Sequence, residues 1–316
     1  MTNSKKTIAI FGASGFLGSS LVLALSQSNQ NLKLFSRNKE KIKLWTVNPN
    51  VEIFNLDLNN LAQITKDLKK TDVVINLLGI LHQSKKESFD NIHHIWPSHL
   101  AKVMKDLGIK RLLHVSALGA SIRAPSLYLK SKALGESELL KQKDLDLTIL
   151  KPSVIFGAKD NFINMFKILV KWLPAIALLS PQSKFQPIFV EDVTKILIKT
   201  LFDKKTYGSV YDLGGPDVYS LKEIIRLIIR SEKLNRLIIP LNRSFSYLFA
   251  FSMEMMPIKI LTRDNWRSMQ VDNVVNTQRV ISYRYSFERL EHYLGNKKNR
   301  SPTRSKYHFY RSKSGR

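Results

Sequence analysis

A glycine-rich segment directly after a short apolar run constrains the fold of this chain more than any other feature. Residues 7–11 have the pattern of a strand, and Gly12, Gly15 and Gly18 then follow at intervals of three before a helix-like stretch. A strand, a glycine turn and a helix in this order bring exposed backbone N–H groups and the positive end of a helix dipole to one point. Glycine lets the backbone approach a ligand where a Cβ would collide. The segment therefore predicts a site for the pyrophosphate of a dinucleotide.

Strand-like and helix-like segments alternate through the first half of the chain. The predicted strands are residues 7–11, 32–35, 51–55, 73–77, 111–116 and 147–150. The predicted helices between them are residues 18–28, 61–69, 91–107 and 127–141. This alternation predicts βαβ units, and the apolar strands indicate a parallel sheet that is covered on both faces. The expected fold is α/β, a Rossmann-like doubly wound parallel sheet.

The second half of the chain has a less regular pattern. Helices are predicted at residues 162–172, 192–202 and 220–231, and strands at 185–190 and 209–213. This part is too short and too interleaved to fold alone, so we expect a small C-terminal α/β lobe over the carboxyl edge of the sheet. The expected organisation is a NAD(P)-binding domain at 1–150, the interleaved lobe at 151–295, and a basic, disordered tail at 296–316.

Charge and cysteine content restrict the possible partners and chemistry. The net charge is +25, from 50 Lys and Arg against 25 Asp and Glu, and the tail contributes eight cations without an acid. Such a field favours phosphates, acidic lipid or nucleic acid, although a lysine-rich surface without a role explains it equally well. The absence of cysteine excludes disulfides, thiolate metal sites and thiol catalysis. No apolar run reaches the ~18 residues of a membrane span, and the N-terminal residues do not resemble a signal peptide.

A tyrosine and a lysine four residues apart are the main candidates for chemistry. Tyr128 and Lys132 lie in a predicted helix, where an i,i+4 pair shares one face, so phenol and ammonium can point at one site. The ammonium is expected to favour the phenolate of Tyr128, since the ordinary pKa of tyrosine is ~10. Ser116 ends the fifth predicted strand, at the edge where ligands of such sheets bind. The candidate catalytic residues are therefore Ser116, Tyr128 and Lys132.

Arg37 is the residue expected to select the cofactor. A site that prefers NAD places an acid about 20 residues after the glycine fingerprint, at the end of the second strand. This chain has Arg37 there, with Lys39 and Lys41 close by. A guanidinium suits a 2′-phosphate, which it can hold with two hydrogen bonds. The sequence favours NADP(H) over NAD(H), with a solvated surface arginine as the alternative.

Three weaker features leave alternatives open. The histidines at 82, 93, 94, 99 and 114 lack a spacing with acids that suits a metal ion, so we expect no metal site. Residues 245–256 are rich in aromatic side chains and methionine, which favours core packing of the lobe, with an interfacial helix or a docking face for a partner as the alternative. The tail could contact membrane phosphates or RNA, and a solvated tail is the simpler interpretation.

The chain resembles the short-chain dehydrogenase/reductase superfamily in its extended or atypical form. More narrowly, it resembles the NADPH-binding accessory subunit of respiratory complex I and its bacterial relatives. The resemblance covers roughly residues 5–295 and weakens beyond 215. It rests on FGASGFLG at 11–18, NLLGIL at 76–81, HVSALGA at 114–120, KPSVIFG at 151–157, DNFIN at 160–164 and FQPIFVEDV at 185–193, with shorter matches at 261–265 and 272–275.

The resemblance implies a role for particular residues. It assigns the pyrophosphate to the glycine turn, and it places Lys132 on the ribose next to the nicotinamide. The residues that it places at the cofactor are Gly12, Ser14, Gly15, Phe16, Leu17 and Gly18 at the turn, Asp57 and Leu58 near the adenine, Leu78 and Gly79 along the cofactor, and Pro152 and Ser153 by the nicotinamide.

Two functions from different classes fit these features. In the first, the protein binds NADPH and is an accessory or assembly subunit of a membrane-bound respiratory NADH:quinone oxidoreductase. In the second, it is a free-standing oxidoreductase or epimerase that uses Ser116, Tyr128 and Lys132 on a small carbonyl or sugar-like substrate. A nucleotide sensor that binds RNA through the tail is a minor third interpretation, and nucleic acid is not the expected partner. We expect a cytoplasmic location, peripheral on the inner membrane through a partner complex, anionic lipid or both.

Overall fold

A seven-stranded parallel sheet forms the centre of the molecule. The computed structural model describes residues 5–84, 87–255, 261–276, 278, 281 and 286–296. In space the strands follow the order β11-β6-β5-β4-β1-β2-β3, so the chain winds outward from β1 in both directions. The strands are β1 (Thr7–Phe11), β2 (Asn31–Ser36), β3 (Val51–Asn55), β4 (Val73–Asn76), β5 (Arg111–Val115), β6 (Asp146–Pro152) and β11 (Ser209–Leu213). All six neighbouring pairs are parallel, which confirms the predicted doubly wound sheet.

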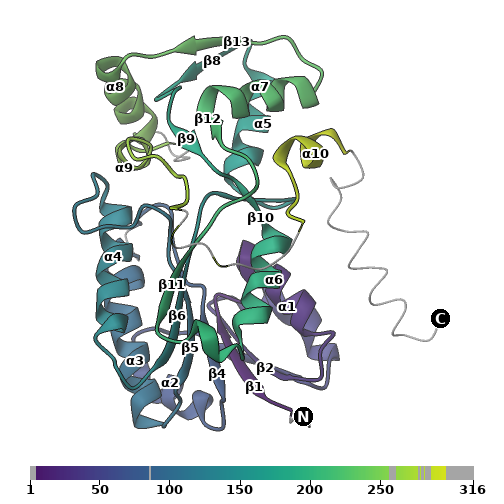
Figure 1. The fold of residues 1–316 in the computed structure, drawn as a ribbon, viewed down its shortest axis with the longest axis vertical. Helices are drawn as coiled ribbons and strands as arrows, with labels where there is room; N and C mark the ends of the chain where they lie inside the picture. The colour runs from purple at the N-terminus through teal and green to yellow at the C-terminus, as the bar shows by residue number, and fades with distance from the viewer. Residues whose placement is uncertain are drawn as a thin grey trace, which may run out of the picture.

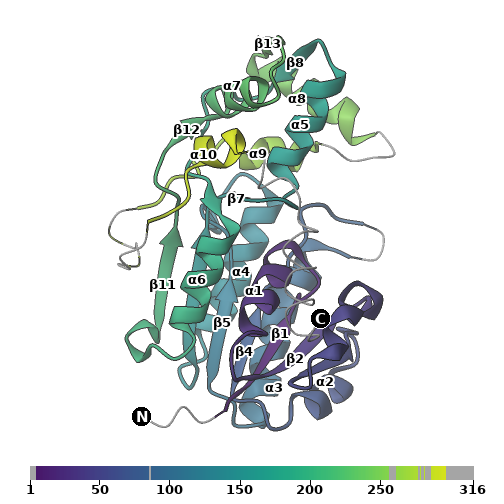
Figure 2. The same cartoon turned by 90° about the vertical axis from the view of Figure 1, so that its right-hand side faces the viewer.

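Helices cover both faces of this sheet, as the apolar strands indicate. On one face α1 (Phe16–Leu25) packs beside α6 (Val190–Thr200) (Figure 2). On the other face lie α2 (Leu61–Leu68), α3 (Trp96–Asp106) and α4 (Leu127–Leu140) (Figure 1). Short helical turns at Lys39–Val47, Asp90–Ile95 and Lys204–Thr206 complete this part of the chain.

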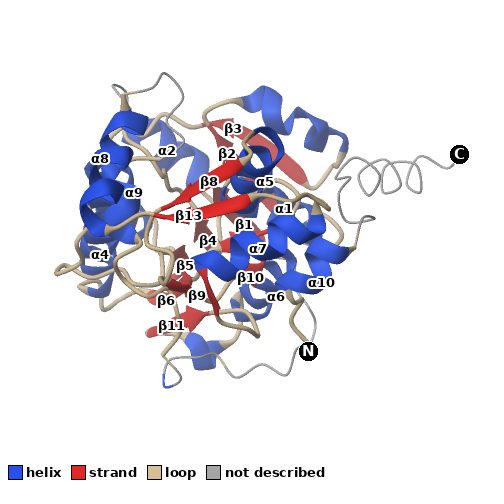
Figure 3. Cartoon of the chain, turned by 90° about the horizontal axis from the view of Figure 1, so that it is seen from above, coloured by secondary structure: helices blue, strands red, loops and turns tan. Residues whose placement is uncertain are grey.

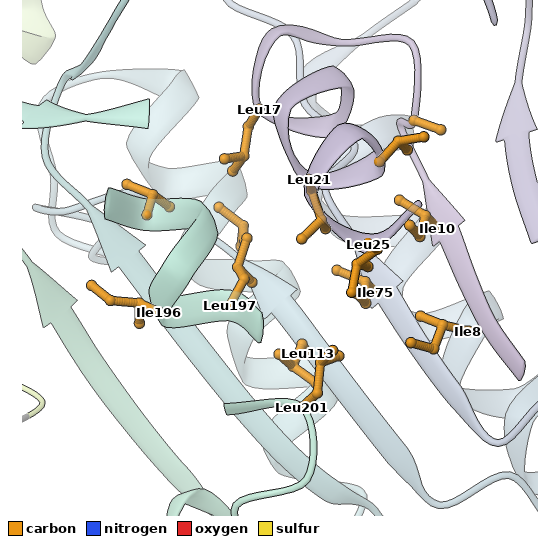
Figure 4. Close-up of a cluster of buried hydrophobic side chains, with 14 of the residues drawn as sticks. Ile8, Ile10, Leu17, Leu21, Leu25, Ile75, Leu113, Ile196, Leu197 and Leu201 are labelled. Carbon is orange, nitrogen blue, oxygen red and sulfur yellow. The ribbon is translucent and has the colours of Figure 1, made fainter. Parts of the chain in front are cut away.

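Alternate residues of the strands divide the core between the two faces. Ile8 and Ile10 of β1 pack under α1 and α6, together with Leu21 and Leu197 (Figure 4). Their neighbours on the same strand point to the opposite face, where they pack against α3 and α4. Because successive side chains of a strand point to opposite faces, a strand that is buried on both sides must be apolar throughout.

The lobe occupies one end of the molecule (Figure 1). Its helices are α5 (Phe162–Trp172), α7 (Leu221–Ser231), α8 (Arg243–Glu254), α9 (Arg263–Ser268) and α10 (Leu290–Gly295). Its two-stranded sheets are β8 (Ala175–Leu178) with β13 (Leu237–Pro240), β9 (Lys184–Phe185) with β12 (Tyr219–Ser220), and β7 (Ile155–Phe156) with β10 (Ile188–Phe189). Between these segments α6 and β11 return to the central sheet, so the lobe and the sheet alternate along the chain.

Two sequence predictions differ from the structure in ways that proline explains. The predicted strand 185–190 is split into β9 and β10, which pair with different partners on either side of Pro187, a residue without an N–H donor. The predicted helix 91–107 starts as a π-helical turn at Asp90–Ile95 and becomes α-helical at Trp96, where Pro97 occupies the first turn. A proline is tolerated there because first-turn N–H groups have no partner within the helix.

Candidate functional site

The predicted site residues follow the ends of successive strands along one edge of the sheet. The glycine turn follows β1, Arg37 follows β2 and Asp57 follows β3. Gly79 follows β4 and Ser116 follows β5, while Pro152 closes β6. Since parallel strands end on the same side, one extended ligand can meet all of these positions.

Close backbone packing explains the glycines of the turn. Gly12 has a φ of +85°, and a Cβ there would lie 3.2 Å from the carbonyl of Leu77. A Cβ on Gly18 would lie 2.1 Å from the carbonyl oxygen of Gly12, so only glycine lets α1 press onto the turn. Gly15 is exposed, and as the residue before α1 it provides no side-chain cap to the helix. The first N–H groups of α1 are therefore suited to bind a phosphate.

The three other predicted residues of the turn have different environments. The hydroxyls of Ser14 and Ser36 hydrogen-bond at 2.9 Å and connect the turn to the end of β2. The ring of Phe16 packs against Gly157, where a Cβ would lie only 3.0 Å from the ring. The side chain of Leu17 points into the core beside α6, so only its backbone faces the turn (Figure 4).

Arg37 has an ion-pair partner that sequence reasoning missed. Its guanidinium pairs with the carboxylate of Glu87, from the segment after β4. Both side chains are partly exposed, Arg37 by 52% and Glu87 by 28%. Close to them at the adjacent strand end, Asp57 is exposed and accepts the N–H of Asn59 at 3.0 Å, while Leu58 packs against the core. The carboxylate of Glu87 would compete with a phosphate for the guanidinium of Arg37.

Lys132 reaches from α4 to the ends of two strands. Its Nζ lies 3.4 Å from the carbonyl oxygens of Leu78 and Val115, the residue before Ser116. A Cβ on Gly79 would lie 3.2 Å from the same Nζ. Burial lowers the pKa of Lys132 to about 8, against the opposing influence of the Glu136 carboxylate. The structure thus brings together three residues that the resemblance assigns to the cofactor, Leu78, Gly79 and Lys132.

Tyr128 does not have the predicted electrostatics. Its ring packs edge-on against Phe89 and His93, at centroid distances of 5.8 and 5.5 Å. Burial raises the pKa of Tyr128 to about 12, whereas the sequence suggested that Lys132 would favour the phenolate. Desolvation of the phenolate dominates because the ammonium is directed at backbone carbonyls.

Ser116 is part of a buried charged network. Its hydroxyl donates to Glu136 Oε1, and Glu136 Oε2 accepts from Lys151 Nζ at 3.0 Å. Lys151 also donates to the carbonyl of Ala120 at 3.1 Å. The side chains of Glu136 and Lys151 are 11% and 8% exposed. Glu136 stands one helical turn after Lys132, so extending the Tyr128–Lys132 spacing by four residues identifies it in the sequence.

Two buried histidines surround the tip of Lys132. His93 Nε2 accepts the N–H of Ile80 at 3.0 Å, so its proton sits on Nδ1, which faces the hydroxyl of Ser131 at 2.9 Å. His114 Nδ1 faces the amide of Asn76 at 3.1 Å, and its buried Nε2 has no hydrogen-bond partner among the described residues. Burial, reinforced by the charge of Lys132, lowers the pKa of His93 to about 2 and that of His114 to about 3.

The lobe contributes two polar residues to this edge. Asn273 Oδ1 accepts from Ser153 Oγ at 2.5 Å and from the N–H of Val154 at 3.0 Å, beside Pro152. The carboxylate of Asp264 on α9 accepts the N–H groups of Leu127 and Tyr128, at 2.7 and 3.1 Å. An acid at this position complements the positive end of the α4 dipole.

Two other features of the described residues bear on metal binding and on membrane insertion. In the part of the chain that the structure describes, histidine, aspartate and glutamate form no group of three that could hold a metal ion. None of the helices among the described residues combines the length and apolar character needed to cross a bilayer.

Comparisons with known sequences identify related proteins. A family described as NAD(P)H-binding matches residues 12–162. The chain is 33% identical to the Arabidopsis thaliana protein named NADH dehydrogenase (ubiquinone) 1 alpha subcomplex subunit 9, mitochondrial, across 69% of this chain and 56% of that protein. It is 29% identical to a Caulobacter vibrioides protein named ceramide reductase, across 62% of this chain and 61% of that one. The chain therefore spans less than two thirds of either relative.

Solved structures share the fold. A nucleoside-diphosphate-sugar epimerase from Staphylococcus aureus superposes with a TM-score of 0.70 at 17% identity, over 92% of this chain and 100% of the other. The similarity includes the lobe, because it extends over nearly the whole chain.

Proposed function

Because the chain belongs to a family of NAD(P)-binding proteins related to short-chain dehydrogenases, we propose that it holds NADP(H) as an accessory subunit of a respiratory NADH:quinone oxidoreductase. Residues 1–150 bind the nucleotide in this proposal, and residues 151–295 form the lobe interleaved with that domain, apart from α6 and β11, which belong to the central sheet. The protein is then peripheral to the inner membrane and acts through the complex.

The hydrogen bond of Ser116 to Glu136 is the observation that favours nucleotide binding without catalytic turnover. A catalytic hydroxyl in this position must be free to polarise a substrate oxygen, yet Ser116 donates to the buried Glu136 carboxylate. Tyr128, with its pKa raised to about 12, stays protonated at neutral pH, so almost no phenolate is available as a base. The open glycine turn and the buried Lys132 fit a bound dinucleotide, which supplies hydride chemistry only where a substrate also binds.

The oxidoreductase alternative has two observations in its favour. Lys132, on the same helix as Tyr128, reaches the carbonyl next to Ser116 at the edge that also carries the glycine turn, and one relative is named ceramide reductase. It requires Ser116 to leave Glu136 when a substrate arrives, so the structure supports it less than it supports nucleotide holding.

Replacing Gly15 with valine is expected to remove the nucleotide while the fold stays intact. Gly15 has φ −73°, which valine adopts readily, but the branched side chain would stand where the phosphate approaches α1. Mass spectrometry of the natively purified protein should find NADPH in the wild type and none in the variant, with unchanged circular dichroism. The wild type should also migrate with respiratory subunits on a native gel. Nucleotide retained by folded Gly15→Val contradicts the phosphate site, while a wild type that migrates alone contradicts the accessory role.

Arg37 and Glu87 are expected to affect NADPH affinity in opposite directions. Arg37→Ala should weaken NADPH binding roughly ten- to a hundredfold, since a charge-assisted hydrogen bond contributes ~1.5–3 kcal/mol. Glu87→Gln should strengthen it up to about fivefold, because an exposed ion pair worth ~0.2–1 kcal/mol no longer competes. NADH lacks the 2′-phosphate, so neither change should alter its affinity much. Titration with both nucleotides measures this, and equal wild-type affinities for NADH and NADPH would refute the preference.

A further inference from the structure

The far end of the lobe has an exposed apolar face, which we call the lobe-tip face. It is formed by the end of α5, by β13 and by α8, which lie together across this end of the molecule when it is seen from above (Figure 3). Trp172 is 82% exposed and Leu248 is 61% exposed. The members of the lobe-tip face are Trp172, Leu173, Leu237, Ile239, Phe245, Leu248, Phe251 and Met255.

Helix α8 is apolar on the side that faces solvent. Its buried side already packs in the lobe, where Ser246 and Ala250 are nearly inaccessible and Ala250 contacts the cluster around Trp266. The described exposed positions 244, 245, 247, 248, 251, 252 and 255 carry Ser, Phe, Tyr, Leu, Phe, Ser and Met, without a charge. A surface helix of a globular protein normally places charged residues on this side. A contiguous patch of this kind marks a contact surface.

Hydrogen bonds fix β13 against the end of α5 and β8, on the chain that leads into α8. The N–H of Leu237 binds the carbonyl of Pro174 at 3.1 Å, where α5 leads into β8. The guanidinium of Arg236 holds the carbonyl of Val170 at 2.7 Å and so fixes the end of α5. At the other end of β13, the N–H of Leu241 binds Leu178 at 3.0 Å just before α8 begins. The lobe-tip face is therefore one continuous, preformed surface.

Exposed cations lie along the side of the lobe-tip face that adjoins α7. Lys171, Arg226, Arg230 and Lys233 are exposed there. The nearby carboxylate of Glu232 is 8% exposed and lies 3.5 Å from Lys171 Nζ. Apolar side chains beside a basic rim are characteristic of segments that bind at a membrane interface, where Trp is also enriched.

We propose that the lobe-tip face docks on an anionic lipid bilayer, with Trp172 and the exposed side of α8 in the headgroup region. The positive rim is complementary to anionic headgroups. A second copy of the chain would instead bring two basic rims together, because a two-fold interface uses the same patch twice. The proposed contact leaves the nucleotide edge free, and it does not depend on the role in a respiratory complex.

Tryptophan fluorescence of the full chain tests the proposal directly. Trp45, Trp96 and Trp266 are buried, at 5%, 1% and 7% exposure, so an environment change at the surface reports on Trp172. Phosphatidylglycerol vesicles should shift the emission to the blue and pellet the protein, and phosphatidylcholine vesicles should do so much less. Trp172→Phe should abolish the shift and keep most of the pelleting.

Variants that carry the same added charge distinguish binding through the lobe-tip face from attraction by the net charge of the chain. Leu248→Glu and Phe251→Glu should each lower the partition coefficient on phosphatidylglycerol at least about tenfold, because each removes a large apolar group from the contact. Val47→Glu adds the same charge at a 71% exposed apolar position in the sheet domain, and it should have little effect. Pelleting without a Trp172 shift, or equal loss in all three variants, would overturn the proposal. A concentration-dependent dimer that Leu248→Glu abolishes, without vesicle binding, would assign the lobe-tip face to self-association instead.

Discussion

Glu136→Ala is expected to destabilise the fold by about 3–5 kcal/mol, the cost of leaving a buried charge without its partner. The substitution removes the carboxylate between Ser116 and Lys151, and the Lys151 side chain is only 8% exposed. The Lys151 ammonium then keeps the carbonyl of Ala120 as a hydrogen-bond acceptor but loses its counter-ion. Urea denaturation followed by circular dichroism measures the loss.

Glu138→Ala is the matched control for this result. Glu138 lies on the same helix and also pairs with a lysine, Lys141, at 2.6 Å, but this pair is at the surface. Its loss should cost less than about 1 kcal/mol. Adding Lys151→Met to Glu136→Leu should recover most of the stability, since an apolar pair of similar volume can replace a buried ion pair. Equal losses for Glu136→Ala and Glu138→Ala would refute the buried network.

Acid is expected to weaken the fold well before most carboxylates titrate. His93 and His114 have an ordinary pKa of 6.5, and burial lowers it to about 2 and about 3 in the folded chain. The unfolded chain therefore takes up protons first, so stability is complete above pH 6.5 and falls as the pH drops below that value. At pH 5 each histidine should lower the free energy of unfolding by about 2 kcal/mol, and the two together by about 4 kcal/mol. Urea midpoints at pH 7.5 and pH 5 measure this difference.

The change in the free energy of unfolding with pH, rather than its value at one pH, identifies the contribution of the two histidines. His114→Asn should lower stability at pH 7.5 through lost packing, and it should halve the further loss between pH 7.5 and 5. His292→Asn replaces a histidine whose side chain is 67% exposed, and it should leave the slope unchanged. A wild-type slope that neither His114→Asn nor the corresponding His93 variant reduces would contradict the assignment.

Local pattern was sufficient to predict the sheet and most of its helices. All six strands predicted in the first half occur within two residues of their expected bounds, because each is a short, mostly apolar run between helix-like segments. The lobe was harder to predict. β8 and β13 are four residues long and apolar on both sides, so their residues do not alternate between apolar and polar. The sequence of residues 245–256 favoured core packing over an interfacial helix or a docking face, whereas half of α8 faces solvent with apolar side chains. Residue 256 and the tail from 297 lie outside the described residues.

Candidate site residues can be recognised in the sequence when a single residue type serves a single role. Glycines that pack against backbone, and a lysine one turn after a tyrosine, can be recognised by spacing. The partners of these groups come from distant segments, as with Glu87 opposite Arg37 and Asn273 opposite Ser153, and spacing does not reveal them. The pKa of Tyr128 depends on how much water surrounds the ring, which only the packed structure determines.

The position of Asp264 has a consequence for motion between the two parts of the molecule. Its carboxylate belongs to α9 in the lobe, yet it holds the first N–H groups of α4, the helix that carries Lys132. A hinge that swings the lobe away from the sheet must release these N–H groups at the positive end of α4. The carboxyl edge of the sheet and the lobe are thus linked mechanically at Asp264, through which a load on the lobe reaches the first turn of α4.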